Sequence, residues 1–442
     1  MAEHVDAQAL DEAVTYTSEL IRIDTTNRGG GDGNERAAAE YVAERLSAVG
    51  IEPVLLEKSP GRTNVVARVA GSDPSAEALL VHGHLDVVPA DPADWSVHPF
   101  SGEIRDGVVW GRGAIDMKNA DAMVMAVVRA WARAGVRPRR DVVLAFTADE
   151  EDSAEFGSEY LAADHADLFE GCTEGISESG AFTFHAADGL RLYPLAAGER
   201  GTGWLTLTAR GTAGHGSKVS RANAVSRLAA AVARIGDHEW PLRITPTVRA
   251  ALLEMAVVHG LPEPDLDAPG FEVDKLLADL GPAAALVEPT VRNSANPTML
   301  KAGYKVNVIP GSATAHVDGR MLAGGEEEFR QTLDKLTGPD VDWEFLHREI
   351  PLEAPVDSPT YATMREALEH FDPEAHVVPF CMSGGTDAKQ FSRLGIVGYG
   401  FSPLKLPEGF DYQALFHGVD ERVPVDALHF GVQVLDRALL AL

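Results

Sequence analysis

The spacing of hydrophobic positions predicts a large region in which helices and strands alternate. Some segments repeat apolar residues at helical spacing, and others are short apolar runs of strand length. Strands that alternate with helices are typical of an α/β sheet, and the chain returns to such units from about residue 352. We expect one domain from residues 1–197 and 353–442. Its first predicted elements are helices 6–24, 34–49 and 117–134 and strands 64–70, 78–88 and 141–148.

A different pattern over residues 198–352 predicts a second, smaller domain. Residues 203–210 alternate between apolar and polar, as in a strand with one solvated face. The following segments complete a β-α-β-β-α-β order, which is typical of a ferredoxin-like α+β domain. The Pro-rich stretch 236–300 is expected to be an insertion within it. The predicted elements are strands 203–210, 304–309, 312–320 and 342–349 and helices 222–235 and 325–337.

Composition narrows the class of protein. The 442 residues include 38 basic and 67 acidic side chains, a formal net charge of −29, which argues against a nucleic-acid partner. No apolar run approaches the roughly 18 residues of a membrane span, and the first residues lack the pattern of a secretory signal. Cys172 and Cys381 are the only cysteines in the sequence, too few for a disulfide scaffold. We therefore expect a cytoplasmic protein without a membrane partner.

Histidines and carboxylates stand where the apolar runs of the larger region end. The run Ala78–Val81 leads into His82, His84 and Asp86, which share one face if the segment is a strand. A metal-binding histidine usually donates its other ring N–H to a carboxylate, and Asp86 is placed to accept it from His84. For His82 alone, we favour a structural role.

Later segments add carboxylates and a histidine in similar positions. Asp116 begins a predicted helix, Glu150 and Glu151 follow an apolar strand, Glu178 lies in a small-residue turn and His417 is near the C-terminus. Open α/β sheets bind ligands at strand ends. Two metal ions that share a carboxylate need about this set, and imidazole with carboxylate suits zinc but also cobalt or manganese. One of the adjacent glutamates can bind metal while the other acts as a general base.

Two other classes of function stay open on the residues. Gly175–Ser179 approaches the Gly-x-Ser-x-Gly pattern of serine hydrolases around Ser177, although a serine replaces the final glycine. A non-catalytic binding protein is the second alternative. A glycine-rich stretch, Gly29–Gly33, lacks the Lys-Ser/Thr that follows in phosphate-binding loops.

The motifs between His84 and Glu421 together resemble the M20 family of metallopeptidases and amidohydrolases. The resemblance implies a zinc-peptidase-like catalytic domain with a mixed sheet and an inserted dimerisation and lid domain. It implies a homodimer with two divalent metal ions, most often Zn²⁺. The implied reaction is hydrolysis of an amide or peptide bond next to a free carboxylate, by an N-acyl amino acid amidohydrolase, a carboxypeptidase or a dipeptidase. A succinyl-diaminopimelate desuccinylase-like deacylase is the alternative within the family.

The resemblance also implies a role for each site residue. His84 and Glu178 are expected to bind one metal, and Glu151 and His417 are expected to bind the other. Asp116 is expected to bridge the two metals, and its peptide bond to Met117 is expected to be cis. Asp86 is expected to orient His84, and Glu150 is expected to transfer the proton.

Motifs in the smaller domain and near residue 385 imply the remaining contacts. His215, in Gly211–Ser217, is expected to reach into the partner's active site and stabilise the oxyanion. An arginine can clamp a carboxylate through two parallel hydrogen bonds. The implied substrate-binding residues are Asn307, Arg320, Gly384, Gly385 and Thr386.

Overall fold

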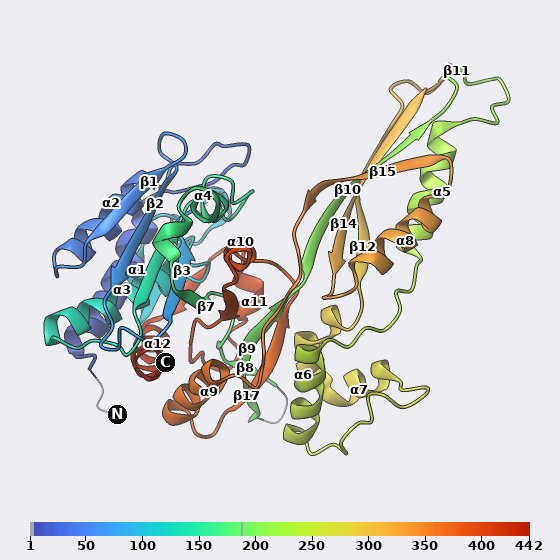
Figure 1. Cartoon of the computed structure of the whole chain (residues 1–442). Coiled ribbons are helices and arrows are strands. Elements are labelled where there is room, and N and C mark those ends of the chain that lie inside the picture. The colour runs from blue at the N-terminus through green and yellow to red at the C-terminus, as the bar shows by residue number, and fades with distance from the viewer. Residues whose placement is uncertain (1–3, 187–188) are drawn as a thin grey trace.

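The computed structural model describes residues 4–186 and 189–442 (Figure 1). A large body surrounds a mixed sheet, and an elongated arm with a second sheet extends away from it. None of the described helices is long and apolar enough to cross a membrane. The architecture is the α/β fold with an additional α+β sheet that the sequence predicts.

The large sheet is mixed, with parallel strands at its centre. β3 pairs in parallel with both β6 and β7, so the carboxyl ends of these three strands meet at one edge. The strands follow the order β1 (Pro53–Glu57), β2 (Thr63–Val69), β6 (Val142–Thr147), β3 (Ala78–His84), β7 (Cys172–Ser177), β18 (Val397–Gly400), β9 (Arg191–Glu199) and β16 (Leu352–Glu353), with β17 (His376–Met382) and β8 (Phe184–His185) also paired to β9.

Helices cover both faces of this sheet, which explains why its central strands are continuous apolar runs. The main core packs the sheet against one group of helices and a smaller cluster packs it against another. The buried helix α3 ends at Gly135, which has a φ of +66° and takes the left-handed cap position. The first group is α1 (Ala7–Arg22), α2 (Arg36–Ser47), α3 (Lys118–Ala134), α9 (Pro359–Phe371) and α12 (Val425–Ala441), and the second is α4 (Ser158–Asp164) and α10 (Ala388–Phe391).

The arm is an open-faced sandwich of four antiparallel strands and two helices. Its sheet has the order β12-β14-β10-β15, the strand order of a ferredoxin-like domain. Along β10, Leu205, Leu207 and Ala209 are buried against the helices while the residues between them face outward. The elements are β10 (Gly201–Arg210), α5 (Ala224–Gly236), β12 (Ser294–Ala302), β14 (Ser312–Met321), α8 (Glu326–Thr337) and β15 (Val341–Arg348).

The structure corrects the sequence prediction for residues 236–309. The second strand of the small sheet is β12, Ser294–Ala302, and not residues 304–309, of which only β13 (Val308–Ile309) is a strand, paired with β11 (Gly214–His215). The helices α6 (Pro246–Val258) and α7 (Val273–Leu280) do not join the arm's core. They form a separate cluster with β9 and β17 of the large sheet.

Two chain crossings join the body to the arm. β9 continues almost directly into β10, and the chain returns after β15 through residues 349–351. One crossing is tied to the loop that precedes α10, and the other is tied to α10 itself. Glu199 accepts hydrogen bonds from Thr386 N (3.1 Å) and Thr386 Oγ1 (2.7 Å), and buried Lys389 forms an ion pair with Glu349 at 3.1 Å.

Candidate functional site

The predicted histidine and carboxylates gather at the carboxyl edge of the parallel strands. His84 is the last residue of β3, Glu150 and Glu151 follow β6, and Glu178 follows β7. Asp116 precedes α3, and its peptide bond to Met117 is cis, as expected from the resemblance. Because parallel strands end at the same edge of a sheet, residues far apart in the sequence meet there.

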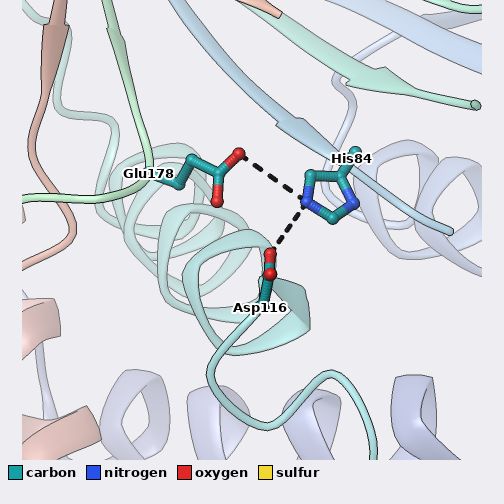
Figure 2. A group of neighbouring side chains, drawn as sticks. All are labelled: His84, Asp116 and Glu178. Atoms are coloured by element: carbon teal, nitrogen blue, oxygen red, sulfur yellow. Dashed lines mark hydrogen bonds and ion pairs between the residues drawn. The ribbon is translucent and has the colours of Figure 1, made fainter. Parts of the chain in front are cut away.

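In one group of three side chains, the carboxylates of Asp116 and Glu178 converge on a single ring nitrogen of His84 (Figure 2). Nε2 lies 3.0 Å from Asp116 Oδ1 and 3.7 Å from Glu178 Oε1. All three side chains are buried, and one donor atom from each lies within 4.8 Å of the others.

A second group shares Asp116 with the first. His417 Nε2 lies 3.3 Å from Asp116 Oδ2 and 3.0 Å from Glu151 Oε2. Asp116 therefore turns one oxygen toward each histidine. Its carboxylate lies between the two groups, which is the position of a bridging ligand.

The donor set of both groups fits divalent metal ions. Imidazole nitrogen and carboxylate oxygen are ligands of zinc, manganese and cobalt. Among the described residues, Glu151 Oε1 is a buried oxygen without a hydrogen-bond donor, which leaves a lone pair free for a cation.

The raised pKa values of the cluster residues show that the cluster favours cations. Burial raises the pKa of Glu178 well above its ordinary value, and the charge of Asp116 raises it further. Burial and Asp116 raise the pKa of Glu151 to about 7. Hydrogen bonds to Asp116 and Glu151 raise the pKa of His417 to about 10. In the metal-free protein these groups therefore retain protons that a metal ion would displace.

Glu150 lies beside the first group, but its carboxylate is farther from His84 than the carboxylate of Asp116 is. Its Oε2 is 3.8 Å from His84 Nε2. Burial raises the pKa of Glu150 well above its ordinary value, and the neighbouring Glu178 and Glu151 add to this effect. A carboxylate whose pKa is raised above its ordinary value is better suited to accept and return a proton.

Asp86 contacts His84 in a different way from the one expected. His84 Nδ1 donates to the backbone carbonyl of Asp86 at 2.9 Å, while the Asp86 carboxylate lies 3.6 Å away. That carboxylate accepts instead from the backbone N–H groups of Glu150 and Glu151, both at 3.2 Å. Asp86 therefore fixes the ring through its main chain and the Glu150–Glu151 turn through its side chain.

Glu421 plays a similar part beneath Asp116, and sequence reasoning did not single it out. Its buried carboxylate accepts from the backbone N–H groups of Ile115 (2.7 Å) and Asp116 (3.1 Å) and pairs with Arg112 at 2.7 Å. The only sequence signal was its position four residues after His417, within the same motif.

A cavity of about 510 Å³ opens onto the cluster, a size typical of small-molecule sites. The cluster carboxylates line it, together with Gly384 and Gly385. The rest of the wall is mainly aliphatic and aromatic, and part of it comes from the 3₁₀ segments Gly281–Leu286 and Glu288–Thr290. The main apolar lining residues are Phe182, Leu286, Pro289, Phe380, Met382, Tyr412 and Phe416.

A smaller, polar cavity of about 150 Å³ is also lined by Glu150 and Glu151. Arg320 and Thr386 line it, so the structure brings both to the cluster. Arg320 is held by Asp318, with Nε to Oδ1 at 2.7 Å, and by Thr202 Oγ1 at 3.2 Å.

His215 and Asn307 are not brought to the cluster. Both belong to the far tip of the arm, where β11 lies in Figure 1. They are exposed neighbours, since Gly216 N donates to the carbonyl of Asn307 at 2.9 Å. Their predicted roles require a contribution from a second chain.

The serine-hydrolase alternative finds no support in the geometry. Ser177 ends β7 and is buried. Within residues 4–186 and 189–442, no histidine nitrogen forms a hydrogen bond with its hydroxyl, so a nucleophile–base pair is missing from the described structure.

Comparisons with known proteins agree with this geometry. The family model for peptidase family M20/M25/M40 matches residues 80–441. The chain is 30% identical to human N-fatty-acyl-amino acid synthase/hydrolase PM20D1, over 83% of this chain and 74% of that protein. It is 26% identical to aminoacylase-1 of Sus scrofa, over 97% of this chain and 95% of that protein. Its fold is similar to that of an M20 family metallo-carboxypeptidase from Sulfolobus solfataricus, with a TM-score of 0.72, 18% identity and coverage of 97% and 99% of the two chains.

The raised pKa values predict that the metal-free protein loses stability as pH rises. The folded state binds more protons than the unfolded state from pH 4.5 to about 7 through Glu151, and from pH 6.5 to about 10 through His417. The free energy of unfolding therefore falls as pH rises through these windows. Thermal unfolding between pH 6 and 9 with a chelator should show this fall, and added Zn²⁺ should reduce it. A chelated protein whose stability is flat or rises over this range would contradict the prediction.

Proposed function

Since the chain belongs to peptidase family M20/M25/M40 and is a metallohydrolase of amide bonds, we propose that it cleaves N-acyl amino acids with an apolar acyl group. The observation that carries this proposal is the 510 Å³ cavity, which is lined by the cluster carboxylates and otherwise mainly by aromatic and aliphatic side chains. The name of the human relative, N-fatty-acyl-amino acid synthase/hydrolase, supports the same class of substrate.

The walls of the cavity favour an acyl group over the free amino terminus of a dipeptide. Phe182, Leu286 and Phe380 would surround the part of the substrate beyond the scissile carbonyl. An ammonium group placed there would lose its hydration without a compensating partner, whereas each buried methylene contributes about 0.8 kcal/mol.

Two metal ions, which we propose are Zn²⁺, would be held by the two side-chain groups. His84 and Glu178 would hold one ion, Glu151 and His417 the other, and Asp116 both. When bound, such ions polarise the amide carbonyl and lower the pKa of the attacking water.

The remaining steps belong to the chain's own residues. Glu150 would accept the proton of the attacking water and return it to the leaving amine. Arg320, with Gly384, Gly385 and Thr386, would bind the free carboxylate of the amino acid. Arg320 lines the polar cavity and Glu150 lines both cavities, so the two ends of the substrate would lie in neighbouring cavities that share the base.

A homodimer would complete the site. The tip of the arm exposes Val219, Tyr304 and Val306, large apolar side chains that are 84% exposed or more. Contiguous exposed apolar surface is typical of protein interfaces. A second chain docked through the arm would bring His215 and Asn307 to the partner's cluster, with residues 198–352 acting as a dimerisation and lid domain. The expected cytoplasmic location rests on the sequence alone.

The proton-transfer role of Glu150 predicts the effect of Glu150→Gln. The amide keeps the shape of the side chain but cannot accept the proton, so kcat should fall by about 10²–10⁴-fold. Metal content, measured by elemental analysis, should stay unchanged. Loss of both metals together with activity would instead indicate a ligand role.

Because His215 would act in the active site of the partner chain, two inactive variants should complement each other. His215→Ala and Glu150→Gln homodimers should each be nearly inactive. Mixing them under conditions that allow chain exchange should restore activity, because one site of the mixed dimer has both an intact Glu150 and an intact partner His215. Sequential affinity purification of two differently tagged variants checks that mixed dimers form. Exchange without recovery would show that His215 does not act across the interface.

The apolar cavity predicts a dependence on acyl chain length. With Zn²⁺, Co²⁺ or Mn²⁺, kcat/KM for N-acyl amino acids should rise by roughly fourfold per methylene over short chains, equivalent to about 0.8 kcal/mol. Dipeptides should be poorer substrates, and a chelator should abolish all turnover. Faster cleavage of dipeptides than of any N-acyl amino acid would overturn the proposal in favour of a dipeptidase.

A wall variant provides the internal control. Phe182 stacks on Tyr412 with ring centroids 4.1 Å apart, and both residues also line an adjoining cavity of about 230 Å³. Phe182→Ala should therefore shift the preferred chain length upward while leaving N-acetyl substrates little changed. An unchanged profile would place the acyl chain elsewhere.

A further inference from the structure

The glycine-rich segment Asn27–Glu35, between α1 and α2, lies against the turn that carries Glu150 and Glu151. The side-chain amide of Asn27 donates to Asp86 Oδ2 at 2.9 Å and to Asp149 Oδ1 at 3.0 Å. Gly30 N donates to Asp152 Oδ2 at 3.0 Å. One neutral amide group therefore bridges two buried carboxylates on either side of the turn.

Arg62 joins the other end of this segment to the same turn. Its Nε and Nη2 each donate to Glu35 at 2.9 Å, and Nη2 also donates to Asp149 Oδ1 at 2.9 Å. These three charged side chains are at most 1% exposed. A planar guanidinium can hold two carboxylates in fixed directions, which an ammonium group cannot do.

The two carboxylates that are held in this way fix the main chain of the turn. Asp149, with a φ of +68°, accepts through its second oxygen from Ser153 Oγ (2.8 Å) and Phe156 N (3.2 Å). The Asp86 carboxylate accepts from the N–H groups of Glu150 and Glu151. The directions of both glutamate side chains therefore depend on where Asp86 and Asp149 lie.

We propose that Asn27 and Arg62 are positioning residues that act through Asp86 and Asp149 to aim Glu150 and Glu151 at the metal groups. Neither residue lines either cavity beside the cluster, so neither contacts the substrate. The proposal rests on the roles assigned to Glu150 and Glu151 in the proposed function.

The glycines of the segment have a packing role in this arrangement. A Cβ on Gly33 would lie 2.9 Å from Arg62 Cζ and 3.0 Å from Arg62 Nη2, closer than real Cβ contacts. Gly33 has no positive φ that would strain an alanine, so Gly33→Ala acts by displacing the guanidinium. The segment that sequence analysis separated from phosphate-binding loops thus allows a buried arginine to approach the turn.

Arg62→Lys is the central test because lysine retains the positive charge but lacks the planar guanidinium that donates to two carboxylates at once. Partners that orient metal ligands typically contribute 10–100-fold to affinity or activity, so kcat on an N-acyl amino acid should fall by about that factor with KM little changed. In the metal-free protein, amide hydrogen exchange over residues 149–156 should accelerate. Gly33→Ala should produce the same pattern more weakly.

Two matched controls separate positioning from general loss of stability. Arg140→Lys alters another buried arginine of the large body, which pairs with Glu174 at 2.6 Å away from the cluster. Gly236→Ala adds a methyl group where nothing lies within 4 Å. Both should leave kcat and exchange over residues 149–156 unchanged, even where Arg140→Lys lowers the melting temperature.

Two results would overturn the proposal. The first is an Arg62→Lys enzyme that melts earlier but keeps its kcat and its exchange rates over 149–156. The second is an equal fall in kcat for Arg140→Lys. If the unaltered protein cleaves no N-acyl amino acid, the proposed function fails, and the exchange measurement together with Co²⁺ affinity still tests whether Arg62 orders the turn.

Discussion

The site depends on buried carboxylates that accept main-chain N–H groups. Asp86 holds the amides of Glu150 and Glu151, and Glu421 holds those of Ile115 and Asp116. A charged acceptor makes such hydrogen bonds stronger than neutral ones, and burial shields them from water. The segments that carry Asp116, Glu150 and Glu151 are therefore each fixed by a second, supporting carboxylate, and these three site carboxylates line the cavity.

This arrangement concentrates negative charge in a region with few cations. Arg62 and Arg112 compensate the supporting carboxylates Glu35, Asp149 and Glu421, but the outer carboxylates Glu150 and Glu178 keep strongly raised pKa values. Buried carboxylates without partners take up protons or bind cations. The same electrostatic imbalance that makes the metal-free protein sensitive to pH thus favours divalent ions at the cluster.

The fold and the cluster could be predicted where a pattern of neighbouring residues in the sequence marks them. They could not be predicted where no such pattern exists. The strand Ala78–His84 begins with an apolar run, is buried throughout and ends at a site residue, so the hydrophobic pattern and the position of His84 suffice to predict both. β12 was missed because it has an exposed free edge and contains Pro297, so no alternation marks it. Asn27 and Arg62 give no local signal, because a buried polar side chain is recognised only through partners that the fold brings from 27 to 122 residues away.

The bonds at the two crossings make the loop before α10 part of the joint between body and arm. Thr386 is bonded to Glu199 through both its amide and its hydroxyl, and Lys389 is paired with Glu349 on the returning strand. A rotation of the arm about these crossings displaces the attachment points of the loop that faces both cavities. Movement of the distant tip of the arm would therefore be transmitted to Gly385 and Thr386, which line the cavities.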